Sequence, residues 1–289
     1  MVFKGSRIVV PGGEVWFKVA GGGASAPVLV IHGIPGSNSR YLDLLAGLAD
    51  DRPVIFYDQL GGGQSDRPSD AGLWTLERFA TELASVRTAL RLSRVHLLGH
   101  SWGGMLAIDH ALADPEGVMS LVLSSVPVSI PRYVSDIRAL RDKLPNSALE
   151  VLLQHERGET IDAAAYEDSV LAFRQRHTFA GVDWPPEFIE LLHSINPDVF
   201  VAVWGADPFD CTGAVRKYER DISSLAMPML LTVGAHDATT PAAAADYRRT
   251  AQSATLHVFQ NSAHMAMLEE PQQYLDVVRQ FLREADAEG

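Results

Sequence analysis

Short runs of apolar residues recur along the chain and are separated by segments with helical periodicity. The runs occupy 28–31, 54–57, 95–98, 121–123, 229–233 and 255–259. A run that is apolar on nearly every position is typical of a strand buried on both faces of a parallel sheet. Two further strand-like segments, 7–10 and 15–20, flank a Pro-Gly-Gly turn and predict a hairpin at the start of the chain.

Helical segments lie between these predicted strands. One predicted helix face carries Phe79, Leu83, Val86 and Leu90. The last segment begins with Pro271, a residue favoured in the first turn of a helix. The alternation of strands with helices predicts an α/β fold with a mostly parallel, doubly wound sheet.

Residues 128–222 break this rhythm. Strand-like runs are scarce there, and prolines punctuate a mostly helix-like stretch. We therefore expect residues 1–127 and 223–289 to form the two parts of one core, with 128–222 inserted between them as a helical cap. The acidic end of the chain, 284–289, is expected to fray.

Composition and charge narrow the classes of partner. The formal net charge is −12, which opposes binding to the phosphate backbone of nucleic acids. The apolar runs are too short to cross a bilayer, so we expect no membrane partner. Residues 1–13 lack the apolar stretch of a signal peptide, and a single cysteine, Cys211, can form no intramolecular disulfide. These features favour a cytoplasmic protein.

The strongest candidate nucleophile is Ser101, at the centre of the pentapeptide GHSWG. This G-x-S-x-G pattern follows the predicted strand 95–98 and precedes a helix-like segment at 104–113. A serine between strand and helix sits on a tight turn, and the flanking glycines let the backbone close around it. Cys211 is a weaker candidate because a lone cysteine is more often inert filling.

The base and the acid are predicted to follow later strands. His264 comes just after the strand 255–259, and Asp237 comes just after 229–233. Both therefore lie at the same edge of the sheet as Ser101, in the chain order serine, acid, histidine. His264 would take the serine proton, and Asp237 would hold the imidazole in the correct tautomer. The alternative for Asp237 is a turn residue without a catalytic role.

Two backbone N–H groups are candidates for an oxyanion hole. One belongs to Ile34 in the loop HGIPG after the first buried strand, and the other to Trp102. His32 in this loop is interpreted as a brace. The turn-rich loop 57–66 lacks the Lys-Ser/Thr end of a phosphate-binding loop and is interpreted as a structural rim. No residues have metal-site spacing, so we expect neither a metal nor an organic cofactor.

Five stretches together resemble the proline iminopeptidase branch of capped α/β-hydrolases. They are 32–36, 57–66, 99–104, 204–209 and 233–237 with its partner His264. The resemblance covers nearly the whole chain. It implies an α/β-hydrolase fold with an inserted helical cap and a triad of Ser101, Asp237 and His264. It also implies substrate contacts at Gly33 and Trp204, and the removal of an N-terminal residue, often proline, from peptides or amides.

The chain departs from this family where the substrate's ammonium group is bound. The family often has Asn-Glu-Phe where this chain has Asp207-Pro208-Phe209, and some members have a second Glu where this chain has Ala238. Both matching positions are uncharged here. Asp207 and Asp210 lie beside the first of them and are candidates to replace the lost glutamate. Otherwise the requirement for an amine is gone.

Three functions remain open at this point. The first is a serine amidohydrolase that removes an N-terminal aminoacyl residue from a short peptide or small amide, including an aminoacyl protecting group on a natural-product intermediate. The second is an esterase, lactonase or carbon–carbon bond hydrolase of the same fold. The third is a ligand-binding module without turnover. Epoxide hydrolases and haloalkane dehalogenases are disfavoured, because both would need Asp at position 101. The sequence gives no indication of the oligomeric state.

Overall fold

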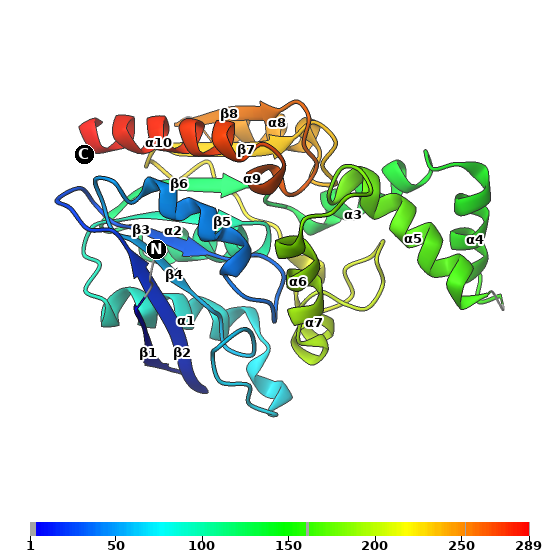
Figure 1. Cartoon of the computed structure of the whole chain (residues 1–289), viewed down its shortest axis with the longest axis horizontal. Coiled ribbons are helices and arrows are strands. Elements are labelled where there is room, and N and C mark those ends of the chain that lie inside the picture. Colours follow the sequence, from blue (N-terminus) through cyan, green and yellow to red (C-terminus); the bar gives the residue numbers. More distant parts are fainter. Residues whose placement is uncertain (1–3, 160–161, 252, 289) are drawn as a thin grey trace.

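An eight-stranded sheet forms the centre of the protein in a computed structural model that describes residues 4–159, 162–251 and 253–288 (Figure 1). The strand order is β1-β2-β4-β3-β5-β6-β7-β8. The first two strands pair antiparallel, β2 pairs antiparallel with β4, and all later pairs are parallel. The strands are β1 Lys4–Val10, β2 Gly13–Ala20, β3 Val28–Ile31, β4 Val54–Tyr57, β5 Val95–His100, β6 Val118–Ser124, β7 Met229–Gly234 and β8 Ala254–Phe259. This topology confirms the predicted fold class.

Helices cover both faces of the sheet. On one face, α1 and α2 pack against the strands through buried residues such as Phe79 and Met105. On the other face, η1 and α10 pack through residues such as Leu45 and Val278. The helices of the core are η1 Arg40–Leu48, η2 Ala71–Leu73, α1 Leu76–Ala89, α2 Trp102–Ala113, α8 Pro241–Thr250, α9 Ala266–Glu269 and α10 Pro271–Glu288. The central strands are therefore buried on both sides, as their apolar runs predicted.

The segment between β6 and β7 is helical and lies beyond the carboxyl ends of the parallel strands (Figure 1). Its helices are α3 Ile130–Arg141, α4 Asn146–Glu156, α5 Ala163–His177, α6 Pro186–Ser194, α7 Pro197–Val203 and η3 Ala214–Lys217. Part of it has a core of its own, built around Ile137, Leu152 and Phe173. We propose residues 128–222 as the bounds of this cap.

The end of the chain differs from its predicted frayed state. Helix α10 continues to Glu288, and Ala285 is buried. Asp286 explains the difference, because its carboxylate pairs with the buried guanidinium of Arg52 at 2.8 Å and contacts the ring of His96 at 3.0 Å. Gly289 lies outside the described residues.

Candidate active site

Ser101 lies on a strained turn between β5 and α2. Its backbone has φ 51° and ψ −120°, a region that residues with a Cβ rarely adopt. The turn is held by hydrogen bonds: the Ser101 N–H donates to the carbonyl of Ser124 at 2.8 Å, and the Gly104 N–H donates to the Ser101 carbonyl at 2.9 Å. The surrounding backbone therefore maintains a conformation that places Ser101, itself largely buried, in the wall of a cavity at the end of the sheet.

The glycines around Ser101 are required by close packing. A Cβ on Gly99 would lie 2.5 Å from the carbonyl oxygen of Gly103, closer than real Cβ contacts allow. A Cβ on Gly103 would collide with the backbone carbonyl of Ile31 at the end of β3. The pattern G-x-S-x-G is thus a packing requirement of this turn as well as a sequence motif.

His264 and Asp237 meet through a hydrogen bond. The Nδ1–H of His264 donates to Oδ1 of Asp237 at 2.8 Å, and the Thr239 N–H donates to the same oxygen at 2.8 Å. The Asp237 side chain is fully buried, and the His264 side chain is 14% exposed. The bond fixes the tautomer in which Nε2 of the imidazole is free to accept a proton.

The environment of His264 raises its pKa above the ordinary histidine value. Burial alone lowers the pKa, because it penalises the charged imidazolium. The charge and the hydrogen bond of Asp237, together with the charge of Glu269, outweigh this penalty. His100, whose ring centroid lies 4.9 Å from that of His264, behaves oppositely: burial and the neighbouring His264 hold the pKa of His100 well below the usual range.

The pH dependence of activity follows from this shift. A general base must be neutral, so kcat/KM should be lost as pH falls through the pKa of His264. Because that pKa is raised, the acid limb is expected above about 6.5, the ordinary histidine value. The measurement is kcat/KM on an aminoacyl anilide across pH. A flat profile, or an acid limb in the range of carboxylates, would remove His264 as the base.

The two predicted oxyanion groups lie beside the nucleophile. Ile34 and Trp102 line the same cavity as Ser101 and His264. Ile34 has φ 53°, so its loop is held in an unusual conformation. Trp102 is the first residue of α2, where a helix leaves its N–H groups without intrahelical acceptors and favours negative charge. Both placements suit the binding of a developing oxyanion.

Gln59 joins these two oxyanion elements and was not singled out from the sequence. Its backbone N–H donates to Nε2 of His32 at 3.0 Å, and its side-chain N–H donates to the His32 carbonyl at 2.8 Å. Its side-chain oxygen accepts the indole N–H of Trp102 at 2.8 Å. The Nδ1–H of His32 donates to the Gly33 carbonyl at 2.8 Å, as expected for a bracing residue.

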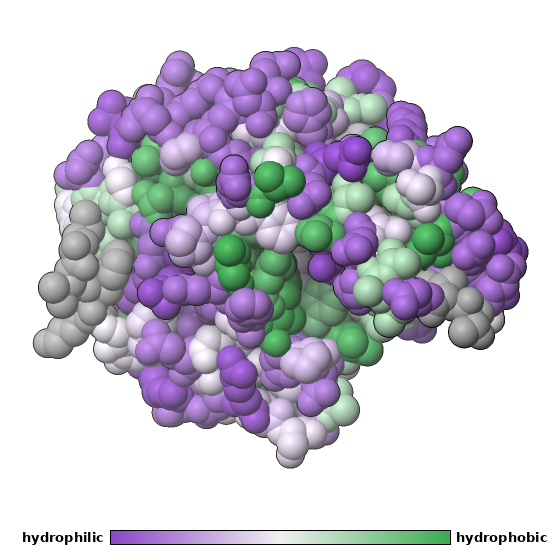
Figure 2. Space-filling model, turned by 45° about the vertical axis from the view of Figure 1, so that its right-hand side comes forward, coloured by the Kyte–Doolittle hydropathy of each residue, from purple (hydrophilic) through white to green (hydrophobic). Residues whose placement is uncertain are grey.

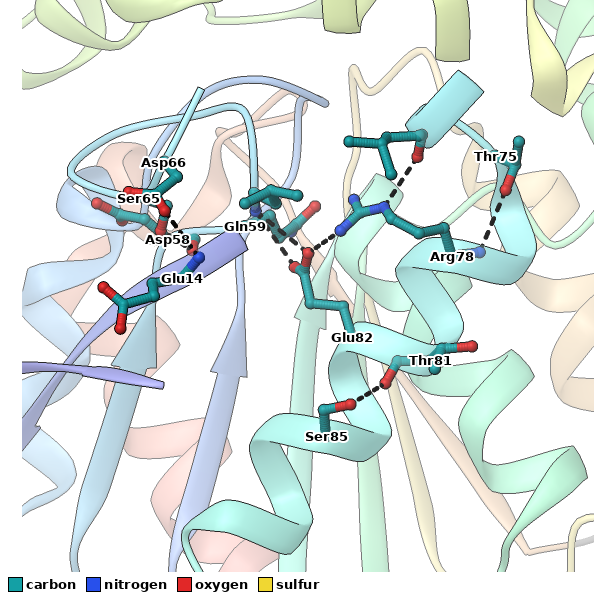
Figure 3. A network of polar contacts seen from close by, with 12 residues as sticks. Glu14, Asp58, Gln59, Ser65, Asp66, Thr75, Arg78, Thr81, Glu82 and Ser85 are labelled. Carbon is teal, nitrogen blue, oxygen red and sulfur yellow. Dashed lines mark hydrogen bonds and ion pairs between the residues drawn. The ribbon is translucent and has the colours of Figure 1, made fainter. Parts of the chain in front are cut away.

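Behind Gln59, a buried ion pair anchors the same loop (Figure 3). Arg78 and Glu82 on α1 form the pair, and Glu82 accepts a hydrogen bond from the Leu60 N–H at 3.3 Å. Asp58 accepts hydrogen bonds from Ser39 at 2.8 Å. The loop 57–66, interpreted from the sequence as a structural rim, therefore also sets the position of the oxyanion elements.

Tyr41 and His100 form a second connection that sequence reasoning missed. The Gly33 N–H donates to the Tyr41 hydroxyl at 2.8 Å, and that hydroxyl donates to Nδ1 of His100 at 2.7 Å. The Nε2–H of His100 donates to the carbonyl of His264 at 3.0 Å. The oxyanion loop and the catalytic histidine are thus joined through buried side chains.

A cavity of about 290 Å³ lies over the nucleophile and is walled by the cap. Its cap wall is rich in aromatic side chains, including Tyr133, Phe173, Phe200 and Trp204. Figure 2 shows apolar surface gathered towards the middle of the face it draws, with hydrophilic surface around the periphery. A pocket of this size and character suits a small acyl group or amino-acid side chain.

The structure places two of the predicted substrate residues in the cavity wall and the other two outside it. Trp204 and Asp207 line the cavity, and so do Pro208 and Ala238. The family that the sequence resembles often has a glutamate at the position of Pro208, and some members have one at the position of Ala238. Asp210 is outside the lining set, and its carboxylate accepts a hydrogen bond from Arg138 at 3.0 Å. The prediction of Asp210 as a substrate contact is therefore not supported by its position, because an arginine on α3 already engages its charge.

Gly33 is also absent from the cavity wall, but it packs closely against Ser101 and His100. A Cβ there would fall 3.1 Å from the Cβ of Ser101 and 2.8 Å from the ring of His100. This position must stay small for the oxyanion loop to approach the nucleophile.

Neither a metal-binding cluster nor a membrane-spanning helix is found among the described residues. Within residues 4–159, 162–251 and 253–288, no cluster of His, Cys, Asp and Glu side chains could hold a metal ion. Among the helices in the described part of the chain, none has the length and apolar character needed to cross a membrane.

The comparisons with known proteins agree with this geometry. Residues 26–271 match the family described as alpha/beta hydrolase fold. The chain belongs to the α/β-hydrolase family. A proline iminopeptidase of Heyndrickxia coagulans is 39% identical to this α/β-hydrolase over 280 residues, covering 95% of this chain and 97% of the relative. This match confirms the resemblance to the proline iminopeptidase branch.

Solved structures extend the likeness of this α/β-hydrolase over the whole fold. The crystal structure of the proline iminopeptidase of Mycobacterium smegmatis has a TM-score of 0.92 at 30% identity, covering 98% of this chain and 99% of that one. The crystal structure of VinJ has a TM-score of 0.91 at 30% identity with the same coverage. The likeness includes the cap, because nearly every residue of each chain is covered.

Proposed function

We propose that this α/β-hydrolase is a serine amidohydrolase that removes an N-terminal aminoacyl residue from a short peptide or small amide. The observation that carries the proposal is the bonded pair His264–Asp237 beside Ser101 in one capped cavity. The similarity to proline iminopeptidases over nearly the full chain supports the same activity. We further propose a cytoplasmic location, which the lone, buried Cys211 supports because it offers no intramolecular disulfide.

The first half of the reaction forms an acyl-enzyme. The Ser101 hydroxyl attacks the scissile carbonyl carbon while Nε2 of His264 takes its proton. The carbonyl oxygen becomes an oxyanion and is bound by the N–H groups of Ile34 and Trp102. The imidazolium, stabilised by Asp237, then gives the proton to the leaving amine, and the C–N bond breaks.

The second half releases the amino acid. Water gives a proton to His264 and attacks the acyl-enzyme carbonyl, which passes through a second oxyanion at the same N–H groups. Collapse of this intermediate returns the proton to Ser101 and frees the carboxylic acid. Apart from the substrate and this water, these steps use only side chains and backbone groups of this chain, and no step needs a metal.

An amide and an ester substrate separate this proposal from the second candidate. We expect kcat/KM for an aminoacyl p-nitroanilide to exceed that for a simple p-nitrophenyl ester of matched acyl size. An anilide that is not hydrolysed, together with rapid ester turnover, would favour an esterase of the same fold.

The amine of the substrate needs a carboxylate, and the cavity supplies a limited choice. Apart from the triad, the carboxylates among the described lining residues are Glu167 on α5 and Asp207 after α7. Oδ1 of Asp207 accepts the Phe209 N–H at 2.7 Å, and a carboxylate can accept further hydrogen bonds beside this one. We propose Asp207 as the group that binds the α-ammonium, in place of the glutamates replaced by Pro208 and Ala238.

The substitution Asp207→Asn tests this assignment, with Asp210→Asn as its matched control. Loss of Asp207 should lower kcat/KM for a free-amine anilide by roughly tenfold to a hundredfold, because an ammonium ion in a partly desolvated pocket loses its counter-charge. The hydrolysis of a des-amino ester of matched acyl size, which carries no ammonium group, should be unaffected. Asp210→Asn should leave kcat/KM unchanged for both substrates, since Arg138 already engages that carboxylate outside the cavity. Equal small effects of both variants would show that neither aspartate binds the amine.

A further inference from the structure

The loop that carries His264 is fastened to the cap by the carboxylate of Glu269. This residue ends α9, and its side chain turns back on the loop. Its Oε2 accepts the backbone N–H groups of Ala263 at 3.0 Å and Met265 at 3.1 Å, one on each side of His264. Its Oε1 accepts the backbone N–H of Ala180 at 2.7 Å, in the segment that follows α5. One carboxylate therefore links both neighbours of the catalytic histidine to the cap.

Backbone hydrogen bonds repeat this connection through residues 177–180, here called the cap strap. The His264 N–H donates to the carbonyl of Thr178 at 3.1 Å. The Ala238 N–H donates to the carbonyl of His177 at 3.2 Å. The cap strap is thus bonded to the loop of the base and also to the loop of the acid.

The loop of the acid is held on both sides of Asp237. The Nδ1–H of His177 donates to the carbonyl of His236 at 2.8 Å, while Ala238 on the other side bonds to the strap. The side chain of Ala238 is also buried in the core of the cap, together with Phe173. Movement of the cap would therefore reach the peptide groups that flank the acid.

We propose that Glu269 is a positioning residue that holds His264 in its catalytic place. Through the cap strap, it also links the position of the cap to the geometry of the triad. His177 and Thr178 also line the substrate cavity. A substrate that contacts the cap strap therefore contacts residues whose backbone groups are hydrogen-bonded to the loops of the base and the acid. This inference rests on the triad of the proposed function.

The charges that face His264 make the role of Glu269 measurable. Asp237 approaches from the loop after β7, Glu269 from α9 and His100 from the end of β5, while His177 of the cap strap faces Asp237. The two carboxylates favour the imidazolium, so removal of the Glu269 charge lowers the pKa of His264. The acid limb therefore reports the charge of Glu269, whereas kcat at the plateau and amide exchange report its positioning role.

The test compares Glu269→Gln with Glu270→Gln. Glutamine keeps the shape of the side chain but offers one acceptor oxygen and no charge. We expect the acid limb of kcat/KM to move to lower pH and kcat at the plateau to fall by roughly tenfold to a hundredfold, because the base is displaced. Glu270 bonds to the Asn261 N–H at 3.0 Å in the same loop, so its glutamine variant should keep the wild-type acid limb. If Glu269→Gln does not fold, Glu269→Asp retains the charge and should combine a wild-type acid limb with reduced kcat.

Amide hydrogen exchange tests the coupling without relying on turnover. In Glu269→Gln, exchange should rise together in the cap strap and in residues 263–265, whereas Glu270→Gln should change neither segment. A rise in both segments with an unchanged acid limb would support the link to the cap strap while contradicting the effect assigned to the Glu269 charge on the pKa of His264. An exchange increase confined to 263–265, or none at all, would overturn the proposal.

Discussion

Replacing Ser101 with alanine is expected to abolish turnover and to leave the fold intact. Removal of a triad member costs roughly 10⁴ to 10⁶ in kcat, because no other group can form the acyl-enzyme. Alanine also carries one Cβ, so the strain at φ 51° is the same in the variant as in the wild type. The measurements are kcat on an aminoacyl anilide and thermal unfolding of the variant.

Ser125 offers a matched control for this variant. It is a buried serine that follows the neighbouring strand β6, and it too has a left-handed backbone, with φ 54°. Its hydroxyl is outside the set of groups that line the cavity, so Ser125→Ala should remain active. Retention of more than about a tenth of wild-type kcat by Ser101→Ala would exclude Ser101 as the nucleophile.

Replacing Asp237 with asparagine should lower kcat by roughly 10² to 10⁴. The uncharged amide can no longer stabilise the imidazolium or enforce the tautomer that Oδ1 now selects at 2.8 Å. The acid limb of kcat/KM should also move to lower pH, because the charge of Asp237 raises the pKa of His264. Steady-state kinetics across pH measure both effects in one series.

Asp210→Asn serves as the control for this exchange of a carboxylate for an amide. That side chain is engaged by Arg138 away from the cavity, so its kinetics and acid limb should match the wild type. An Asp237→Asn variant with wild-type kcat would mean that Asp237 is only a turn residue, which is the alternative left open by the sequence.

The parts of the fold that could be predicted from the sequence rest on local patterns. Strands buried on both faces need apolar residues at consecutive positions, and the segments 28–31 and 54–57 have them. The turn at Ser101 needs glycines because a Cβ cannot fit there, so the motif and the geometry coincide. Asp237 and His264 could be placed because both follow strands that end at the same edge of the sheet.

The residues that sequence reasoning missed act through partners distant in the chain. Tyr41 bonds to a ring 59 positions away, and Gln59 bonds to an indole 43 positions away. Glu269 bonds to a backbone N–H 89 positions away. Because nearly every residue has a backbone N–H, the amino-acid type at that position does not reveal the contact. The same reason explains the ordered end of the chain, because the partner of Asp286, Arg52, lies 234 positions earlier. Periodicity and motifs report neighbours along the chain, whereas these contacts exist only after folding.

The central claim is hydrolysis of an N-terminal aminoacyl amide at a site that requires the free amine. Its most direct test is mass-spectrometric identification of the products from two short peptides that differ only in N-terminal acetylation. We predict release of the N-terminal residue from the free peptide, no release from the acetylated one, and loss of the reaction in Ser101→Ala. Equal cleavage of both peptides, or cleavage of neither by a protein that hydrolyses simple esters, would contradict the account.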